Sequence, residues 1–190
     1  MCMKVIVFSW VGNTGKTSAI DLLRYSFLEK DPKARILVLH ETAIEYISKV
    51  WLESVNRKEM QAHIAQTEKE RIDFLVAMKK IDHYDYVLID RTYVDGLLYT
   101  YWNVLLWYSA DMNCYITDQD YKSISKNLYD HVVFFSEPIK PDLLFQDYNH
   151  QEFGEIFYQT IQFIYSEKVL LLDNNIQFSN NREKYIALFN

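Results

Sequence analysis

Residues 4–18 read Lys-Val-Ile-Val-Phe-Ser-Trp-Val-Gly-Asn-Thr-Gly-Lys-Thr-Ser, an apolar run and a tight turn followed by Gly15-Lys16-Thr17 at the start of a helical pattern. A strand, a glycine-containing loop and a helix in this order are typical of a phosphate-binding P-loop, in which backbone N–H groups point at anionic oxygens. Lys16 would then reach the β- and γ-phosphates of a nucleotide, and the Thr17 hydroxyl would ligate Mg²⁺. The predicted nucleotide-binding residues are Gly12, Asn13, Thr14, Gly15, Lys16, Thr17 and Ser18.

The match to the full P-loop pattern is incomplete, because that pattern has a glycine where Trp10 stands, five residues before Gly15. Gly-Lys-Thr alone is a short motif, and the alternative is an ordinary strand–turn–helix connection with a solvated Lys16. The hydrophobic strand directly before the motif, the helix directly after it and the position near the N-terminus favour the P-loop.

Composition limits the classes of protein and partner that fit this chain. At 190 residues and 49% hydrophobic content we expect a single domain over residues 1–190, with a candidate lid loop at 137–150. The net charge of −6 argues against a nucleic-acid partner, which would need a basic face, but it permits a nucleotide substrate.

Cysteine usage and hydropathy indicate where the protein works. Cys2 and Cys114 give neither a disulfide framework nor the spacing of a metal site, so a reduced, cytoplasmic setting is expected. The longest apolar stretch covers about residues 96–110 and is too short to cross a bilayer, so no membrane partner is expected.

Apolar runs alternate with helical patterns along the chain, which predicts an α/β fold with three layers: a five-stranded parallel sheet with helices on both faces and a small lid. Ligands in such folds bind at the carboxyl ends of the strands. The expected strands cover residues 4–8, 35–40, 84–90, 131–135 and 168–172, and the expected helices cover about residues 16–29, 42–52, 58–81, 93–108, 118–128, 151–166 and 182–189.

Two further strand ends carry polar residues that suit phosphoryl transfer. Asp90 follows an apolar strand as a Walker-B carboxylate does and would hold Mg²⁺, or else it caps the next helix together with Thr92. Arg91 offers a fixed cation for a phosphoryl group, or forms a surface ion pair. Glu41 would accept a proton from an attacking hydroxyl, or simply favour a helix N-terminus.

The order of these motifs resembles the P-loop nucleoside and nucleotide kinases. The resemblance rests on the P-loop, on Leu-His-Glu-Thr-Ala after the second strand, and on Ile-Asp-Arg-Thr-Tyr-Val-Asp before an aromatic helix. It is strongest to the NadR-like ATPase/kinase group and extends to thymidylate and deoxynucleoside kinases. It implies that Mg·ATP is bound, that Glu41 is the base or orients the acceptor, that Arg91 binds phosphate and that Gln66 hydrogen-bonds the substrate base. On its pattern alone, Gln66 is a polar residue on a long polar helix.

Aromatic residues add candidates for a base-stacking pocket, although most are expected to pack in the core. The candidates are Trp51, Phe74, Tyr93, Tyr99 and Trp102. With Gln66 and Lys140, Tyr93 completes the predicted substrate contacts.

The chain departs from such kinases in its lid, which in the family supplies arginines to the transferring phosphoryl group. No arginine lies between Arg91 and Arg182, and Lys140 is the only basic residue of the candidate lid. Lys122, Lys126 or a partner chain in a homodimer would be alternative sources of positive charge.

Three functions are compatible with these sequence motifs. The first is an ATP-dependent kinase of a nucleoside or nucleoside monophosphate. The second is a nucleotide-binding switch or weak NTPase with a degenerate lid, and the third is a ribosylnicotinamide-type kinase.

Overall fold

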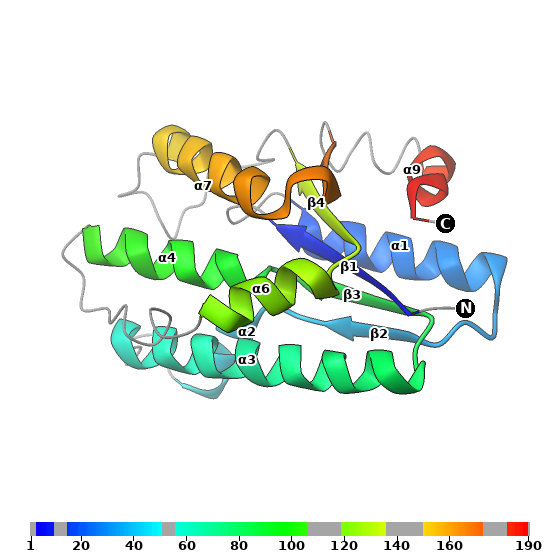
Figure 1. Cartoon of the computed structure of the whole chain (residues 1–190), viewed down its shortest axis with the longest axis horizontal. Coiled ribbons are helices and arrows are strands. Elements are labelled where there is room, and N and C mark those ends of the chain that lie inside the picture. Colours follow the sequence, from blue (N-terminus) through cyan, green and yellow to red (C-terminus); the bar gives the residue numbers. More distant parts are fainter. Residues whose placement is uncertain are drawn as a thin grey trace.

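The computed structural model describes residues 3–9, 15–50, 56–105, 119–135, 150–172 and 182–189. Five strands form one parallel sheet in the order β2-β3-β1-β4-β5 (Figure 1). Their bounds are β1 Lys4–Ser9, β2 Ile36–Leu39, β3 Tyr86–Asp90, β4 His131–Phe135 and β5 Val169–Leu172.

The helices follow the predicted ranges closely. They are α1 Lys16–Lys30, α2 Thr42–Lys49, α3 Arg57–Ile81, α4 Tyr93–Leu105, α6 Gln119–Leu128, α7 His150–Tyr165 and α9 Arg182–Leu188, with a 3₁₀ turn, η3, at Ser166–Lys168. The expected helix over 42–52 stops earlier, at Lys49, where the backbone of Val50 turns to an extended conformation. The last residues expected for the aromatic helix, 106–108, lie outside the described residues.

Both faces of the sheet are covered, as the continuous apolar strands predict. Val5 and Val7 of β1 pack into a core with α3, α4, α6 and α7. Ile6 and Phe8 point to the opposite face and pack against α1 and α9. The side chains of successive strand residues alternate between faces, so one apolar run serves two cores. The predicted three-layer α/β architecture is confirmed.

Parallel pairing aligns the strand ends that matter for function. Phe8 of β1 is opposite Asp90 of β3, and Leu39 of β2 is opposite Ile89. Ser9, Glu41 and Arg91 therefore emerge at the same edge of the sheet. In Figure 1 the arrowheads of β1 and β2 point to the side where α1 begins and α2 lies.

The two helices that bound this edge have local sequence signals. Asn56 caps α3 by accepting hydrogen bonds from the backbone N–H groups of Lys58 and Glu59. Thr92 caps α4, because its hydroxyl oxygen accepts the backbone N–H of Asp95 at 3.0 Å. Among the described residues, no helix combines the length and apolar character that a membrane span requires.

Candidate active site

The start of α1 has the conformation that the glycine of the motif permits. Gly15 has φ 82°, in the left-handed region, and its carbonyl accepts the backbone N–H of Ala19 at 3.0 Å. A side chain at this position would cost about 1 kcal/mol. Lys16 is 5% exposed, whereas Thr17 and Ser18 lie on the exposed side of the first turn. Gly12, Asn13 and Thr14, also predicted to bind nucleotide, lie outside the described residues.

Asp90 ends β3 directly beside this turn. The Thr17 hydroxyl donates a 2.7 Å hydrogen bond to Asp90 Oδ2. The second oxygen, Oδ1, is buried and has no hydrogen-bond partner within the described parts of the chain. Because Thr92 caps α4, the carboxylate of Asp90 is not occupied by that task. The two predicted metal ligands therefore lie together, with one carboxylate oxygen available to a ligand.

Arg91 is held in an unusual backbone conformation. Its φ is 88°, a left-handed value that costs a residue with a Cβ about 1 kcal/mol or more. The backbone N–H donates to the Phe8 carbonyl at 2.8 Å, which fixes the turn after β3 to strand β1. Its Nε donates to Glu41 Oε1 at 2.6 Å, and the guanidinium lies 4.8 Å from the centroid of the Tyr99 ring. The structure thus brings Glu41 and Arg91 together as an ion pair.

The charged groups of Lys16, Glu41 and Arg91 shift one another's pKa values. Burial, followed by the nearby charge of Arg91, lowers the pKa of Lys16 to about 8, while Asp90, Glu41 and Asp95 act to raise it. Burial acts to raise the pKa of Glu41, but Arg91 and Lys16 outweigh it and hold that pKa below its ordinary value. Glu41 is therefore ionised at neutral pH, and Lys16 remains mostly protonated.

Asp95 is a site residue to which the sequence motifs assigned no role. It is fully buried in the first turn of α4, and its Oδ1 accepts hydrogen bonds from the hydroxyls of Ser9, at 2.7 Å, and Thr92. Burial raises its pKa to about 6, against the lowering effects of Arg91, the two hydroxyls and Lys16. The spacing Thr92-x-x-Asp95, a capping box, was the signal available in the sequence. Asp95 links the last residue of β1 to the turn after β3.

A pocket opens beside the Glu41–Arg91 pair, between α2, α3 and α4. Its volume of about 90 Å³ exceeds several-fold the roughly 10–15 Å³ that one water needs, so it accepts a ligand group of several atoms. Its polar and charged lining residues are Glu41, Thr42, Gln61, Glu68, Arg91 and Thr92, and the rest of the wall is formed by Ala43, Met60, Ile64, Gly96 and Tyr99.

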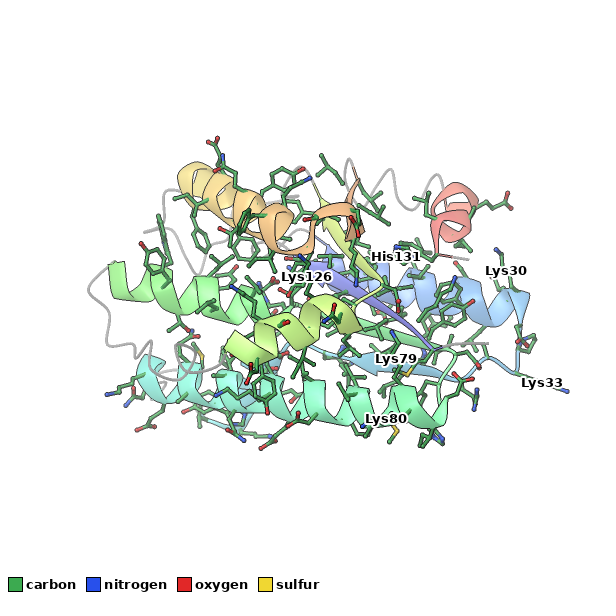
Figure 2. All side chains as sticks on the ribbon, viewed as in Figure 1. Lys30, Lys33, Lys79, Lys80, Lys126 and His131 are labelled. Carbon is green, nitrogen blue, oxygen red and sulfur yellow. The ribbon has the colours of Figure 1, made fainter. Side chains whose placement is uncertain are left out.

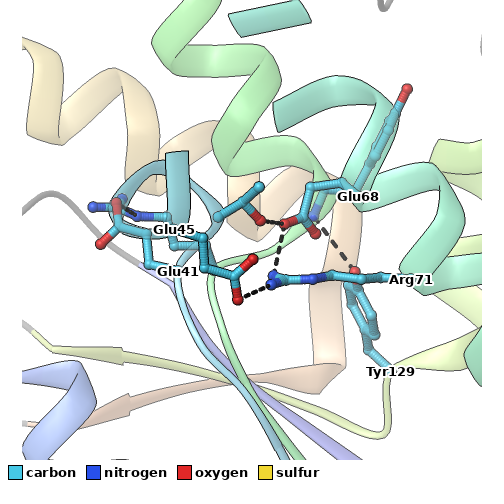
Figure 3. A network of polar contacts seen from close by, with 8 residues as sticks. Glu41, Glu45, Glu68, Arg71 and Tyr129 are labelled. Atoms are coloured by element: carbon cyan, nitrogen blue, oxygen red, sulfur yellow. Dashed lines mark hydrogen bonds and ion pairs between the residues drawn. The ribbon is translucent and has the colours of Figure 1, made fainter. Parts of the chain in front are cut away.

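Glu68 anchors the wall of this pocket in a polar network that joins α2 to α3 (Figure 3). It is 4% exposed and accepts the Thr42 hydroxyl at 2.6 Å and Arg71 Nη1 at 3.0 Å. Arg71 also bonds Glu45 Oε1 at 3.3 Å. Burial raises the pKa of Glu68, and Arg71 and Thr42 partly offset that rise. The network fixes the position of α2 and hence of Glu41 at its N-terminus.

The predicted substrate contacts are placed less favourably than the predicted phosphate contacts. Gln66 is exposed on α3 and donates to Glu70 of the same helix at 2.8 Å, outside the pocket lining, where Gln61 stands instead. Tyr93 is buried in the core and packs near Tyr121. Lys140 and the candidate lid up to residue 149 lie outside the described residues.

Of the aromatic candidates, Tyr99 alone among the described residues reaches the pocket. Trp102 packs in the core against Phe153, with ring centroids 4.6 Å apart, and Phe74 is 40% exposed on α3. Trp51 lies outside the described residues. The expectation that most of these rings pack in the core fits Tyr93 and Trp102.

The alternative cations on α6 lie away from the pocket. Lys122 and Lys126 are both exposed, and neither lines it. The backbone carbonyl of Lys126 accepts a hydrogen bond from Lys168, which precedes β5, so Lys126 belongs to the edge where the strands begin. Figure 2 shows Lys126 on α6 and Lys30 at the C-terminal end of α1.

The chain resembles known proteins in its structure. No family model and no curated protein sequence matches the chain. Solved structures do match. The structure is similar to that of NadR in complex with NR, with a TM-score of 0.63 and 16% sequence identity over 91% of this chain. It is also similar to thymidylate kinase from Ehrlichia chaffeensis, with a TM-score of 0.62 and 11% identity over 98% of this chain and 99% of that one.

The chain has the fold of the P-loop kinases. A second NadR structure, in complex with NAD and AMP-PNP, matches with a TM-score of 0.57, 15% identity and 92% coverage of this chain. The chain spans less than half of the NadR chains that it matches, 44% and 45% of their length, whereas it spans nearly the whole thymidylate kinase. At these identities the likeness establishes the fold, and the site must be argued from its own residues.

Proposed function

We propose that the protein is an ATP-dependent kinase that transfers the γ-phosphoryl group to a hydroxyl of a nucleoside or to the phosphate of a nucleoside monophosphate. One observation supports this proposal most strongly. The buried Lys16 and the Thr17–Asp90 pair lie beside the Glu41–Arg91 ion pair, which lines a pocket. The start of α1, which would bind phosphate, and the pocket, which would bind the acceptor, therefore lie next to each other at one edge of the sheet.

The residues present fit Mg·ATP. Backbone N–H groups at the start of α1 and the Lys16 cation suit the β- and γ-phosphates. Thr17 Oγ1 and Asp90 Oδ1, which has no hydrogen-bond partner among the described residues, are hard oxygen donors. Mg²⁺ is usually held by one or two such groups together with phosphates and waters. Bound there, Mg²⁺ would neutralise charge on the phosphates.

Glu41 suits the role of base in the acceptor pocket. The acceptor O–H would lose its proton to the Glu41 carboxylate as its oxygen bonds to the γ-phosphorus. The bond from that phosphorus to the β–γ bridging oxygen breaks, and ADP leaves. Glu41 is held ionised by Arg91 and can therefore accept the proton. Arg91 carries further N–H groups that suit an oxygen of the transferring group.

The lid remains a proposal drawn from the sequence. Residues 137–150 would close over the phosphates, and Lys140 would supply the cation that arginines supply in similar kinases. Since a lysine cannot make the bidentate contact of an arginine, transfer should be slower than with an arginine lid. The same lack of lid arginines favours, as a second candidate, a nucleotide-binding switch or weak NTPase.

One assay separates these candidates. The protein is incubated with Mg·ATP and, singly, with nucleosides that include nicotinamide riboside and with nucleoside monophosphates, while ADP is measured. A kinase releases ADP in proportion to a phosphorylated acceptor, which ³¹P NMR identifies. ADP release at the same rate with and without an acceptor would favour the weak NTPase. No ADP release in any mixture would contradict both the kinase and the weak NTPase proposals.

A further inference from the structure

The charges that line the acceptor pocket are mostly negative. Within the described parts of the chain, its charged lining residues are Glu41, Glu68 and Arg91. Arg91 is the one cation among them, and Glu41 already holds it at 2.6 Å. Glu68 brings a second carboxylate to the wall and is 4% exposed.

The residues behind the wall do not reverse this balance. Arg71 pairs with Glu68 at 3.0 Å and with Glu45 at 3.3 Å, so it is shared between two carboxylates (Figure 3). The two separate groups of ion pairs, Glu41–Arg91 and Glu45–Arg71–Glu68, hold three carboxylates against two guanidinium groups. Lys16, which also acts on Glu41, is assigned to the phosphates of the nucleotide. The chain segments next to the lining helices, residues 51–55 and 103–118, contain no lysine or arginine in their sequence.

A phosphate group in this pocket would have to share Arg91 with Glu41, which already accepts its Nε at 2.6 Å. The phosphate dianion would then lie next to the Glu41 and Glu68 carboxylates, and like charges juxtaposed away from bulk water repel each other strongly. A nucleoside without a phosphate imposes no such cost. Its hydroxyl approaches Glu41 as a hydrogen-bond donor and leaves the ion pair intact.

Other groups of the pocket suit the base of a nucleoside. Gln61 lines the pocket and is 4% exposed, its Oε1 lies 2.8 Å from the Thr100 hydroxyl, and its amide nitrogen is a hydrogen-bond donor of the kind that a base can use. Glu68 offers an acceptor on the same helix. Met60, Ile64 and the Tyr99 ring give the flat, apolar contact that a heterocycle requires.

We propose that the acceptor is a nucleoside that carries no phosphate, and that Glu68 and Gln61 form the determinant that selects it over its own monophosphate. This inference rests on the proposed kinase function and deepens it. The selecting element is the excess of carboxylates around a cation that is already paired.

The test compares each nucleoside with its own 5′-monophosphate through the ratio of their kcat/KM values. Because both compounds carry the same base, contacts to the base cancel in this ratio. The panel is adenosine, guanosine, cytidine, uridine, thymidine and nicotinamide riboside. With saturating Mg·ATP, the ratio of kcat/KM for the best nucleoside over its monophosphate should be about 100 or more. Calorimetry with a non-hydrolysable ATP analogue present measures the affinities of the best nucleoside and of its monophosphate. The ratio of these affinities gives a second test that does not depend on turnover.

Two variants with opposite expected effects test the charge argument. Glu68→Gln removes a negative charge and should lower the ratio by about tenfold, while Gln61→Glu adds one and should raise it by about tenfold. Ala62→Glu is the matched control, because it places the same new charge on the exposed side of α3 one residue away. Its ratio should change by less than about twofold. If Glu68→Gln fails to fold, Gln61→Glu carries the test.

Each outcome decides the inference separately from the proposed function. Acceptor-dependent ADP release with a monophosphate preferred over its nucleoside would overturn the inference and leave the kinase proposal standing. A ratio that Glu68→Gln and Gln61→Glu leave unchanged would remove these residues as the determinant. If no member of the panel binds or reacts, the pocket is not a nucleoside site and the inference fails.

Discussion

Asp95 gives the prediction whose size follows most directly from the structure. Asp95 lies in the first turn of α4, and its fully buried carboxyl contacts Ser9, the last residue of β1. Burial raises the pKa of this carboxyl from 3.8 to about 6. The folded protein therefore binds this proton more tightly than the unfolded chain does. The resulting stability is fully present below pH 3.8 and is lost as the pH rises through about 6. A shift of this size corresponds to about 3 kcal/mol.

Replacing Asp95 with asparagine keeps the shape of the side chain and removes the titration. The amide oxygen of the asparagine can still accept the hydroxyls of Ser9 and Thr92, whereas its new N–H₂ group enters a buried position at a cost of about 1–3 kcal/mol. That cost does not depend on pH. The free energy of unfolding of the wild type, minus that of the variant, should therefore fall by about 2 kcal/mol or more between pH 4 and pH 8.

Urea unfolding followed by tryptophan fluorescence at several pH values measures this difference. Asp21→Asn, which removes an exposed carboxylate on α1, serves as the control and should show a pH-dependent change below about 0.5 kcal/mol. A difference for Asp95→Asn that stays constant with pH would refute the argument that burial controls this group. A difference that rises with pH would show that Lys16 and Arg91 stabilise the carboxylate by more than burial costs it.

Further predictions concern the chemical step and the pocket wall. Glu41→Gln should lower kcat by about 100-fold and leave the affinity for Mg·ATP nearly intact, because the amide cannot accept a proton; equal turnover in a steady-state assay would remove Glu41 from the mechanism. Thr17→Val deletes the hydroxyl that bonds Asp90, and it should raise the Mg²⁺ concentration needed for half-maximal turnover about tenfold; an unchanged Mg²⁺ titration would argue against Thr17 as a ligand. Arg71→Leu leaves the buried Glu68 without its cation and should cost about 3 kcal/mol of unfolding free energy; a loss below about 1 kcal/mol in urea would show that the network does not hold α2.

The sequence predicted the fold well because its elements carry strong local signals. The apolar runs of β1 and β3 indicate strands buried on both faces, and Asp31-Pro32 marks the end of α1. Glycine at position 15 meets the left-handed φ at the helix start. The order of strands in the sheet depends on contacts between distant residues, and no local pattern carries it.

The position of Lys16, Thr17 and Asp90 at one edge of the sheet was predictable for a related reason, whereas the pocket was not. Lys16, Thr17 and Asp90 follow strand ends, and parallel strands bring such residues to one edge. The helix α3 is polar along most of its length, so its sequence does not say which side faces inward. Gln61 and Gln66 are five residues apart, about 140° around a helix, and the structure turns Gln61 inward and Gln66 outward. The Glu68–Arg71 network likewise needs tertiary contacts to form.

The proposed kinase must bind the phosphates of Mg·ATP at the start of α1 through Lys16, and isothermal calorimetry with a non-hydrolysable ATP analogue measures that binding. Lys16→Ala should weaken binding at least about 100-fold, because it removes a nearly buried cation from a site that must hold several negative charges. Lys30→Ala, at the exposed far end of the same helix, is the matched control and should bind as the wild type does (Figure 2). Equal affinity of Lys16→Ala and Lys30→Ala for the analogue would show that Lys16 does not bind the phosphates.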